Sequence, residues 1–129
     1  MVEPASENDA LTEKVIGLAI EVHRHLGPGL LEGAYEECLC HELKRARIVF
    51  KRQVTVPVVY KSISLDYRYR LDLVVENQLL VEMKSVERLM PVHEAQVITY
   101  LRITGLRVGL LLNFNSDVLK NGIRRLVLK

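Results

Sequence analysis

The sequence predicts an α/β fold in which a mixed β-sheet is flanked by helices, in the order α-α-β-β-β-α-β-(α)-β. Two observations lead to this prediction. Apolar residues recur with helical spacing up to residue 46 and then alternate with the period of a strand. Three consecutive strands are followed by a helix and then by an almost continuous apolar run over residues 108–114, which is typical of a strand buried on both faces. A helix that connects such strands packs against the sheet.

Two neighbouring helices are expected first. One covers residues 11–26, with Asn8 or Asp9 as its cap, and ends at Gly27-Pro28-Gly29 because neither glycine nor proline continues a helix well. The other covers residues 30–46 and includes Tyr35, whose hydroxyl should find a hydrogen-bond partner inside the core. The positions expected to be buried on the two helices are Leu11, Val15, Leu18, Ala19, Val22, Leu26, Leu31, Tyr35, Leu39 and Leu43.

The strands are expected after Arg47. Residues 48–60 are rich in β-branched side chains, and Pro57 marks a sheet edge or a bulge among them. Pro91 opens a later helix, which Gly105 ends. The full set of remaining elements is a turn at 61–62, strands over 65–75 and 79–84 joined by a turn at 76–78, a helix over 92–104, a strand over 108–114, a helical turn over 117–121 and a strand over 123–128.

Length and composition indicate one globular domain. The chain has 129 residues, of which 49% are hydrophobic and 26% charged, so it is large enough to bury a core. We expect a single domain over residues 1–129, with residues 1–8 as a flexible tail. Apolar runs are too short for a membrane span, the N-terminal segment is too polar for a secretory signal, and Cys38 and Cys40 are poorly spaced to bond each other. These features predict a cytoplasmic protein.

The net charge of +2 does not by itself indicate a nucleic-acid-binding protein. The absence of tryptophan also disfavours base stacking as the main mode of binding. Basic residues nevertheless form two clusters, which are either solvated surface, the more common case, or a patch that contacts phosphates. The clusters are Lys44, Arg45, Arg47, Lys51 and Arg52, and Lys120, Arg124, Arg125 and Lys129.

The hairpin over residues 70–84 carries the candidate chemistry, and its register decides which side chains meet. A two-residue loop would place Asp72 opposite Val81. A three-residue loop, with Asn77 in the left-handed conformation, places Asp72 opposite Glu82. The second register also gathers the apolar residues on one face, so we favour it. That face consists of Leu71, Leu73, Val75, Leu79, Val81 and Met83.

In this register Asp72 and Glu82 repel each other, because two carboxylates that lie directly opposite destabilise a strand pair. Arg70 and Lys84, opposite each other on the same face, could neutralise them on an exposed charged surface. Alternatively the two carboxylates bind a divalent cation, and their hard oxygen atoms suit Mg²⁺ or Mn²⁺. Such a cation lowers the pKa of bound water and stabilises charge on a phosphate. Lys84 would then orient the nucleophile or offset phosphate charge.

The pattern of Asp72 followed by Glu82-Met83-Lys84, on a hairpin that precedes a helix, resembles the PD-(D/E)XK nuclease superfamily. This resemblance implies a restriction-endonuclease-like fold. Leu71 stands where the superfamily's name has proline, which is not a metal ligand. The chain is also similar, over nearly its whole length, to the GxxExxY protein family within that superfamily. The segments that carry this second resemblance are residues 29–35 (Gly-Leu-Leu-Glu-Gly-Ala-Tyr), 91–101 and 109–115.

The resemblance implies roles for individual residues. Asp72 and Glu82 would bind the metal, and Lys84 would be the catalytic lysine. Glu32 would be the acidic residue that an early helix contributes, as a third metal ligand. An acid in the first turn of a helix also has an ordinary role as a cap or a partner of the helix dipole.

Gln96 and Tyr100 lie four residues apart on one helix face and resemble the Q-x3-Y element of RecB-type exonuclease domains. Ordinary packing of the helix surface would explain the same spacing.

Taken together, the resemblance implies a nuclease that depends on Mg²⁺ or Mn²⁺ and hydrolyses phosphodiester bonds in nucleic acid, with DNA favoured over RNA. The alternative is a catalytically silent module of the same fold that binds nucleic acid or a protein partner, because fold alone does not decide function. Two copies of the chain could also pair as a homodimer.

Overall fold

The computed structural model describes residues 9–128. The flexible tail expected over residues 1–8, and Lys129 of the second basic cluster, lie outside the described residues. The elements in chain order are α1 (Ala10–Leu26), α2 (Glu32–Arg45), β1 (Phe50–Tyr60), β2 (Ile63–Val75), β3 (Leu79–Lys84), α3 (Pro91–Thr104), β4 (Val108–Asn113), the 3-10 helix η1 (Leu119–Gly122) and β5 (Ile123–Val127).

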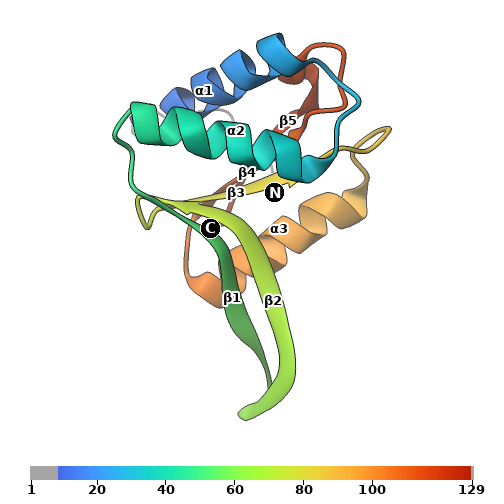
Figure 1. Ribbon diagram of the computed structural model, residues 1–129. Helices are drawn as coiled ribbons and strands as arrows, with labels where there is room; N and C mark the ends of the chain where they lie inside the picture. Colours follow the sequence, from blue (N-terminus) through green and yellow to red (C-terminus); the bar gives the residue numbers. More distant parts are fainter. Residues whose placement is uncertain (1–8, 129) are drawn as a thin grey trace.

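The five strands form one sheet in the order β1-β2-β3-β4-β5. Neighbouring strands are antiparallel except β3 and β4, which are parallel. Parallel strands need a crossover connection, and α3 provides it. The α1 and α2 helices cover one face of the sheet, and α3 covers the other (Figure 1). The predicted α/β fold, its mixed sheet and its element order are therefore confirmed.

Each face of the sheet has its own apolar core. The first lies between the sheet and the α1–α2 layer, and the second lies between the sheet and α3. Leu110 and Leu112 belong to the first core and Leu111 to the second, so β4 is buried on both faces, as its apolar run predicts. None of the helices within residues 9–128 is long and apolar enough to cross a membrane.

Glycine and proline set most helix ends where the sequence predicts them. Gly27 follows α1 with a φ of 70°, Pro91 begins α3, and Gly105 ends α3 in the left-handed conformation. The prediction was wrong at the start of α2, which begins two residues later than expected. Leu31 has extended backbone there, so its side chain leaves the buried stripe and is 84% exposed. Leu26, the last residue of α1, is also exposed.

The β1 and β2 strands continue beyond the rest of the sheet as a two-stranded arm, which we define as residues 54–70 (Figure 1). β1 is an edge strand of the sheet, and the register of the two strands shifts between Pro57 and Val59, so both positions predicted for Pro57, an edge and a bulge, are found. The tip is the predicted turn at Lys61-Ser62, where both residues have positive φ. Because no third strand pairs with it, the arm projects from the body of the protein.

Leu71 does not lie on the face that the sequence predicts. Leu73 packs in the first core with the other apolar residues of the hairpin, whereas Leu71 packs in the second core with Tyr100. Gln53, which lies between the β1 residues paired with these two, has a φ of 50°. A left-handed residue inside a strand interrupts the regular alternation of side chains. The apolar side chains of β2 therefore point to one face of the sheet at Leu71 and to the other face at Leu73. Asp72 lies between these two residues.

Candidate active site

The β2–β3 hairpin has the predicted three-residue loop. Glu76 and Asn77 both have positive φ, of 53° and 55°, which closes the loop tightly. The register therefore follows the apolar pattern, as predicted. The paired residues are Val75 with Leu79, Val74 with Leu80, and Leu73 with Val81. The predicted pairing of Val75 with Leu79 is therefore confirmed, and Asp72 and Glu82 are the next positions beyond the last paired residues.

Each of the two carboxylates accepts a hydrogen bond from the opposite strand. The backbone N–H of Asp72 donates to Oε2 of Glu82 at 2.8 Å, and the backbone N–H of Met83 donates to Oδ2 of Asp72 at 2.9 Å. In a regular antiparallel pair these N–H groups would donate to backbone carbonyls, whereas here they donate to side-chain oxygens. Within the described residues the β2–β3 pairing ends before these positions. The expected pairing of Arg70 with Lys84 is therefore wrong.

Burial dominates the electrostatics of the pair. Glu82 is only 3% exposed, and its pKa is raised to about 8, first by burial and then by the negative charge of Asp72. Asp72 is half-buried, and burial likewise raises its pKa, while the hydrogen bond from the Met83 N–H acts in the opposite direction. Two carboxyl groups that interact in this way titrate as a coupled pair.

Protein cations do not neutralise this pair within the part of the chain that the structure describes. The ion pairs formed there involve other carboxylates, and neither Arg70 nor Lys84 comes within ion-pair distance of Asp72 or Glu82. The positive charge of Lys84 still lowers the pKa of both carboxyls, which places its ammonium nearby. The interpretation of an exposed, internally neutralised surface is therefore wrong, because Glu82 is buried and the cross-strand ion pairs do not form.

The α3 helix brings two of the predicted residues to the carboxylates. The Lys84 Nζ donates to Gln96 Oε1 at 3.1 Å, so the lysine at the end of β3 is held by the helix that follows it. Tyr100, one turn after Gln96, is buried. Its pKa is raised first by burial and then by the charges of Glu82 and Asp72, which shows that its hydroxyl lies in their field.

The α2 helix carries two acids beside the site. Glu32, the first residue of α2, is exposed, and its charge adds to the rise in the pKa of Asp72. Glu36, one turn later, acts on the same carboxyl more strongly. It is 6% exposed and accepts hydrogen bonds from Arg52 at 3.0 Å and from Gln53 at 2.9 Å. Sequence reasoning missed Glu36, because its position directly after the buried Tyr35 is only a weak signal.

The loop before Glu32 is fixed from two sides. The Tyr35 hydroxyl accepts a hydrogen bond from the Leu30 N–H at 3.0 Å and donates one to the Gly27 carbonyl at 2.6 Å. Ser85, directly after Lys84, donates its hydroxyl to the Leu30 carbonyl at 2.6 Å. The Tyr35 ring is fully buried against Phe114, as expected of a core aromatic. These bonds hold the start of α2 next to the end of β3.

The two basic clusters are partly neutralised inside the protein. Arg52 of the first cluster pairs with Glu36 at 2.9 Å. In the second cluster, Arg124 lies 3.9 Å from Glu94 and Arg125 pairs with Asp9. The solvated or internally paired interpretation fits these residues better than a phosphate-binding patch.

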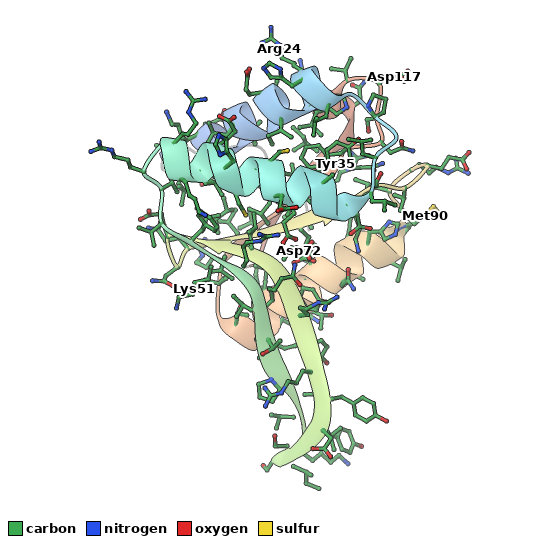
Figure 2. The ribbon with its side chains drawn as sticks, in the orientation of Figure 1. Arg24, Tyr35, Lys51, Asp72, Met90 and Asp117 are labelled. Atoms are coloured by element: carbon green, nitrogen blue, oxygen red, sulfur yellow. The ribbon has the colours of Figure 1, made fainter. Side chains whose placement is uncertain are left out.

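The pair has oxygen atoms available for a cation. No described residue donates a hydrogen bond to Oδ1 of Asp72 or Oε1 of Glu82. Mg²⁺ commonly uses one or two carboxylates and completes its shell with water and substrate phosphates, so two carboxylates of this kind fit it. Within residues 9–128 no preformed group of three or more His, Cys, Asp or Glu side chains is arranged to hold a metal. Figure 2 shows Asp72 on β2 below the N-terminal half of α2.

A mixed five-stranded sheet with helices on both faces, and an acidic pair with a lysine on its central hairpin, is consistent with the restriction-endonuclease-like fold. A family model, that of the PD-(D/E)XK nuclease superfamily, matches residues 9–126, and the chain belongs to this superfamily. No curated protein and no solved structure matches the chain significantly.

Proposed function

We propose that the chain is a single nuclease-like domain of the GxxExxY type, and that it hydrolyses phosphodiester bonds in nucleic acid with Mg²⁺ or Mn²⁺. The observation that carries this proposal is the carboxylate pair of Asp72 and Glu82. A buried carboxylate is normally paired with a cation, but the buried Glu82 lies next to a second carboxylate, that of Asp72. Perturbed carboxyl groups of this kind are typical of functional sites.

The carboxylates would hold the cation through Oδ1 of Asp72 and Oε1 of Glu82, the oxygens that backbone N–H groups leave free. Glu32 would supply a third oxygen ligand from the start of α2. Two features support this role: its charge already acts on Asp72, and the Tyr35 and Ser85 bonds fix the loop before it. A divalent cation lowers the pKa of water and stabilises charge on phosphate oxygens.

Lys84 would act on the reacting phosphate. Its ammonium orients the attacking water or offsets negative charge at the scissile phosphate during in-line attack. Gln96 would be the positioning residue, since its Oε1 accepts a hydrogen bond from Nζ and so holds the ammonium at the end of β3. Tyr100 would present its hydroxyl to the same site. We favour DNA over RNA as substrate.

The test is cleavage of labelled DNA and RNA, single- and double-stranded, in Mn²⁺, in Mg²⁺ and in chelator. We expect Asp72→Asn and Lys84→Ala each to lower the rate by about 100-fold or more, as the loss of a metal ligand or an electrostatic group does. Glu87→Gln, which neutralises an exposed carboxylate outside the site, and Lys14→Ala on α1 are the matched controls. Cleavage that persists in chelator, or in both site variants, would contradict the proposal.

A catalytically silent module is the second candidate, and one observation favours it. The described residues contain no group of three metal-binding side chains, so a cation would depend on the pair, on Glu32 and on substrate oxygens. Calorimetric titration with Mn²⁺ separates the two candidates. A nuclease binds Mn²⁺ more weakly after Asp72→Asn, whereas a silent module shows the same weak heat with both proteins.

A further inference from the structure

The arm, residues 54–70, is the part of the molecule that the proposed active site does not use. Its strands pair with each other; Val54, Val56 and Tyr69 at its base pack against the second core, and its outer part projects from the body of the protein (Figure 1). It carries three basic residues, Lys61, Arg68 and Arg70, and one acid, Asp66. The net charge of the arm therefore equals the +2 of the whole chain, and the rest of the protein is neutral overall.

Arg68 and Arg70 alternate with Asp72 along β2. Side chains two residues apart lie on the same side of a strand, about 6.8 Å from one another. Tyr69 and Leu71, the residues between them, pack in or against the second core. The two arginines are thus turned away from that core, and both are exposed. A row of positive charge leads along one side of the arm to the acidic pair.

The two arginines have no protein partner among the described residues. Arg52, by contrast, lies at the base of the arm and is bound by Glu36. Within residues 9–128 no carboxylate comes within ion-pair distance of Arg68 or Arg70, and neither guanidinium donates a hydrogen bond to a protein group. Free guanidinium groups are well suited to phosphate, because their donors form two parallel bonds to its oxygens.

The tip of the arm adds exposed aromatic surface. Tyr60, beside the turn, is 59% exposed, and the Lys61 Nζ lies 5.4 Å from the centre of its ring; Tyr67, farther along β2, is 73% exposed. A two-stranded ribbon has the dimensions to enter the major groove of a DNA duplex, which is about 12 Å wide. Aromatic and basic side chains at the end of such a ribbon match the base edges and phosphates that line the groove.

We propose that the arm binds double-stranded DNA and guides it to the acidic pair. The tip enters the major groove, and Arg68 and Arg70 bind phosphates on the way to Asp72. A second copy of the chain is a less suitable partner for the arm. Symmetric pairing of two arms would bring the unpaired arginines of both copies together, and their positive charges would repel each other. This inference rests on the proposed function for its substrate class, but it concerns binding and is measured without cleavage.

The test measures binding of a labelled DNA duplex by fluorescence anisotropy in chelator, so that the duplex stays intact. We expect the double variant Arg68→Gln/Arg70→Gln to weaken binding by about 10-fold or more and to reduce the slope of log K against log salt by about 2. The matched control is Arg102→Gln/Arg107→Gln, which removes the same charge from exposed sites on and after α3. It should change the affinity by less than about 2-fold.

Equal affinity of the arm variant and the control variant would overturn the inference. It would also be overturned if Tyr60→Ser/Tyr67→Ser converts a dimer to a monomer in sedimentation without weakening DNA binding, because the arm would then bind a second copy.

The two proposals can fail separately. Arm-dependent binding without cleavage in Mn²⁺ leaves the arm inference standing and removes the nuclease. Cleavage that the arm variant performs as well as the control variant leaves the nuclease standing and removes the arm.

Discussion

Glu36 and Glu82 are both buried acids close to Asp72, but they differ in the groups that bind their carboxylates. Glu36 receives the guanidinium of Arg52 and the amide of Gln53. Glu82 accepts a hydrogen bond from a backbone N–H and lies next to another carboxylate. Among the described residues, no basic side chain lies within ion-pair distance of it. Unpaired buried charge is costly, whereas paired buried charge is tolerated. The contrast supports a structural role for Glu36 and agrees with the proposal that Glu82 binds a cation.

The largest effect expected from this contrast is a pH dependence of stability. The pKa of Glu82 is about 8 in the folded protein and lies near the ordinary 4.5 in the unfolded chain. The folded state therefore holds the proton more tightly between these values, and the contribution to stability is full below pH 4.5 and is lost as the pH rises through about 8. Each pH unit in this window is worth about 1.4 kcal/mol.

Urea denaturation in chelator at pH 5 and pH 8 measures this loss. Glu82→Gln is the reference, since its amide oxygen can still accept from the Asp72 N–H but does not titrate. We expect wild type to lose several kcal/mol more than Glu82→Gln between the two pH values. Identical pH profiles for the two proteins would show that Glu82 titrates normally.

The second prediction concerns the ion pair between Glu36 and Arg52. Arg52→Ala leaves the buried Glu36 without its guanidinium, and because the Arg52 side chain is itself 41% exposed we expect a loss of about 1–2 kcal/mol. Lys51→Ala removes a neighbouring, exposed basic residue and should change the free energy of unfolding by less than about 0.5 kcal/mol. Equal effects of the two substitutions would remove the structural role assigned to Glu36.

The third prediction concerns the loop that places Glu32. Tyr35→Phe removes the hydroxyl that joins the Leu30 N–H to the Gly27 carbonyl, and we expect a loss of about 1–2 kcal/mol in stability. If the loop positions Glu32, the rate of cleavage should fall as well. Tyr60→Phe, at the exposed tip of the arm, is the control for the effect of a lost tyrosine hydroxyl on the free energy of unfolding. An unchanged cleavage rate in Tyr35→Phe would separate the loop from the site.

The sequence predicts the parts of the fold that local chemistry decides. Gly27, Pro91 and Gly105 mark helix ends because of their backbone preferences. The register of the β2–β3 hairpin follows from the apolar alternation together with a three-residue loop, so the meeting of Asp72 and Glu82 is also predictable.

Long-range geometry decides the rest. Alternation alone places Leu71 beside Leu73, but the left-handed Gln53 on the neighbouring strand exchanges the faces between them. Glu36 has no local signal strong enough to distinguish it from Glu32, because its burial depends on Arg52 and on packing against the sheet. The sequence also does not show that strands β1 and β2 extend beyond the other strands of the sheet and form an arm.

The smallest effect is expected at the acidic pair itself in the absence of metal. Asp72→Asn removes the repulsion with Glu82, while its amide oxygen can still accept from the Met83 N–H. We therefore expect the free energy of unfolding in chelator to rise by about 0–1 kcal/mol, on the scale of cross-strand pairs. A structural role for the carboxylate would predict a loss of stability instead.

The most direct test of the account compares melting temperatures of wild type and Asp72→Asn in chelator and in millimolar Mn²⁺. A ligand that binds only the folded state raises its stability by mass action. We predict that Mn²⁺ raises the melting temperature of wild type and leaves that of Asp72→Asn unchanged, because the variant has lost one of the two paired carboxylates. A variant that melts lower than wild type in chelator, together with indifference of both proteins to Mn²⁺, would contradict the assignment of Asp72 and Glu82 as a metal site.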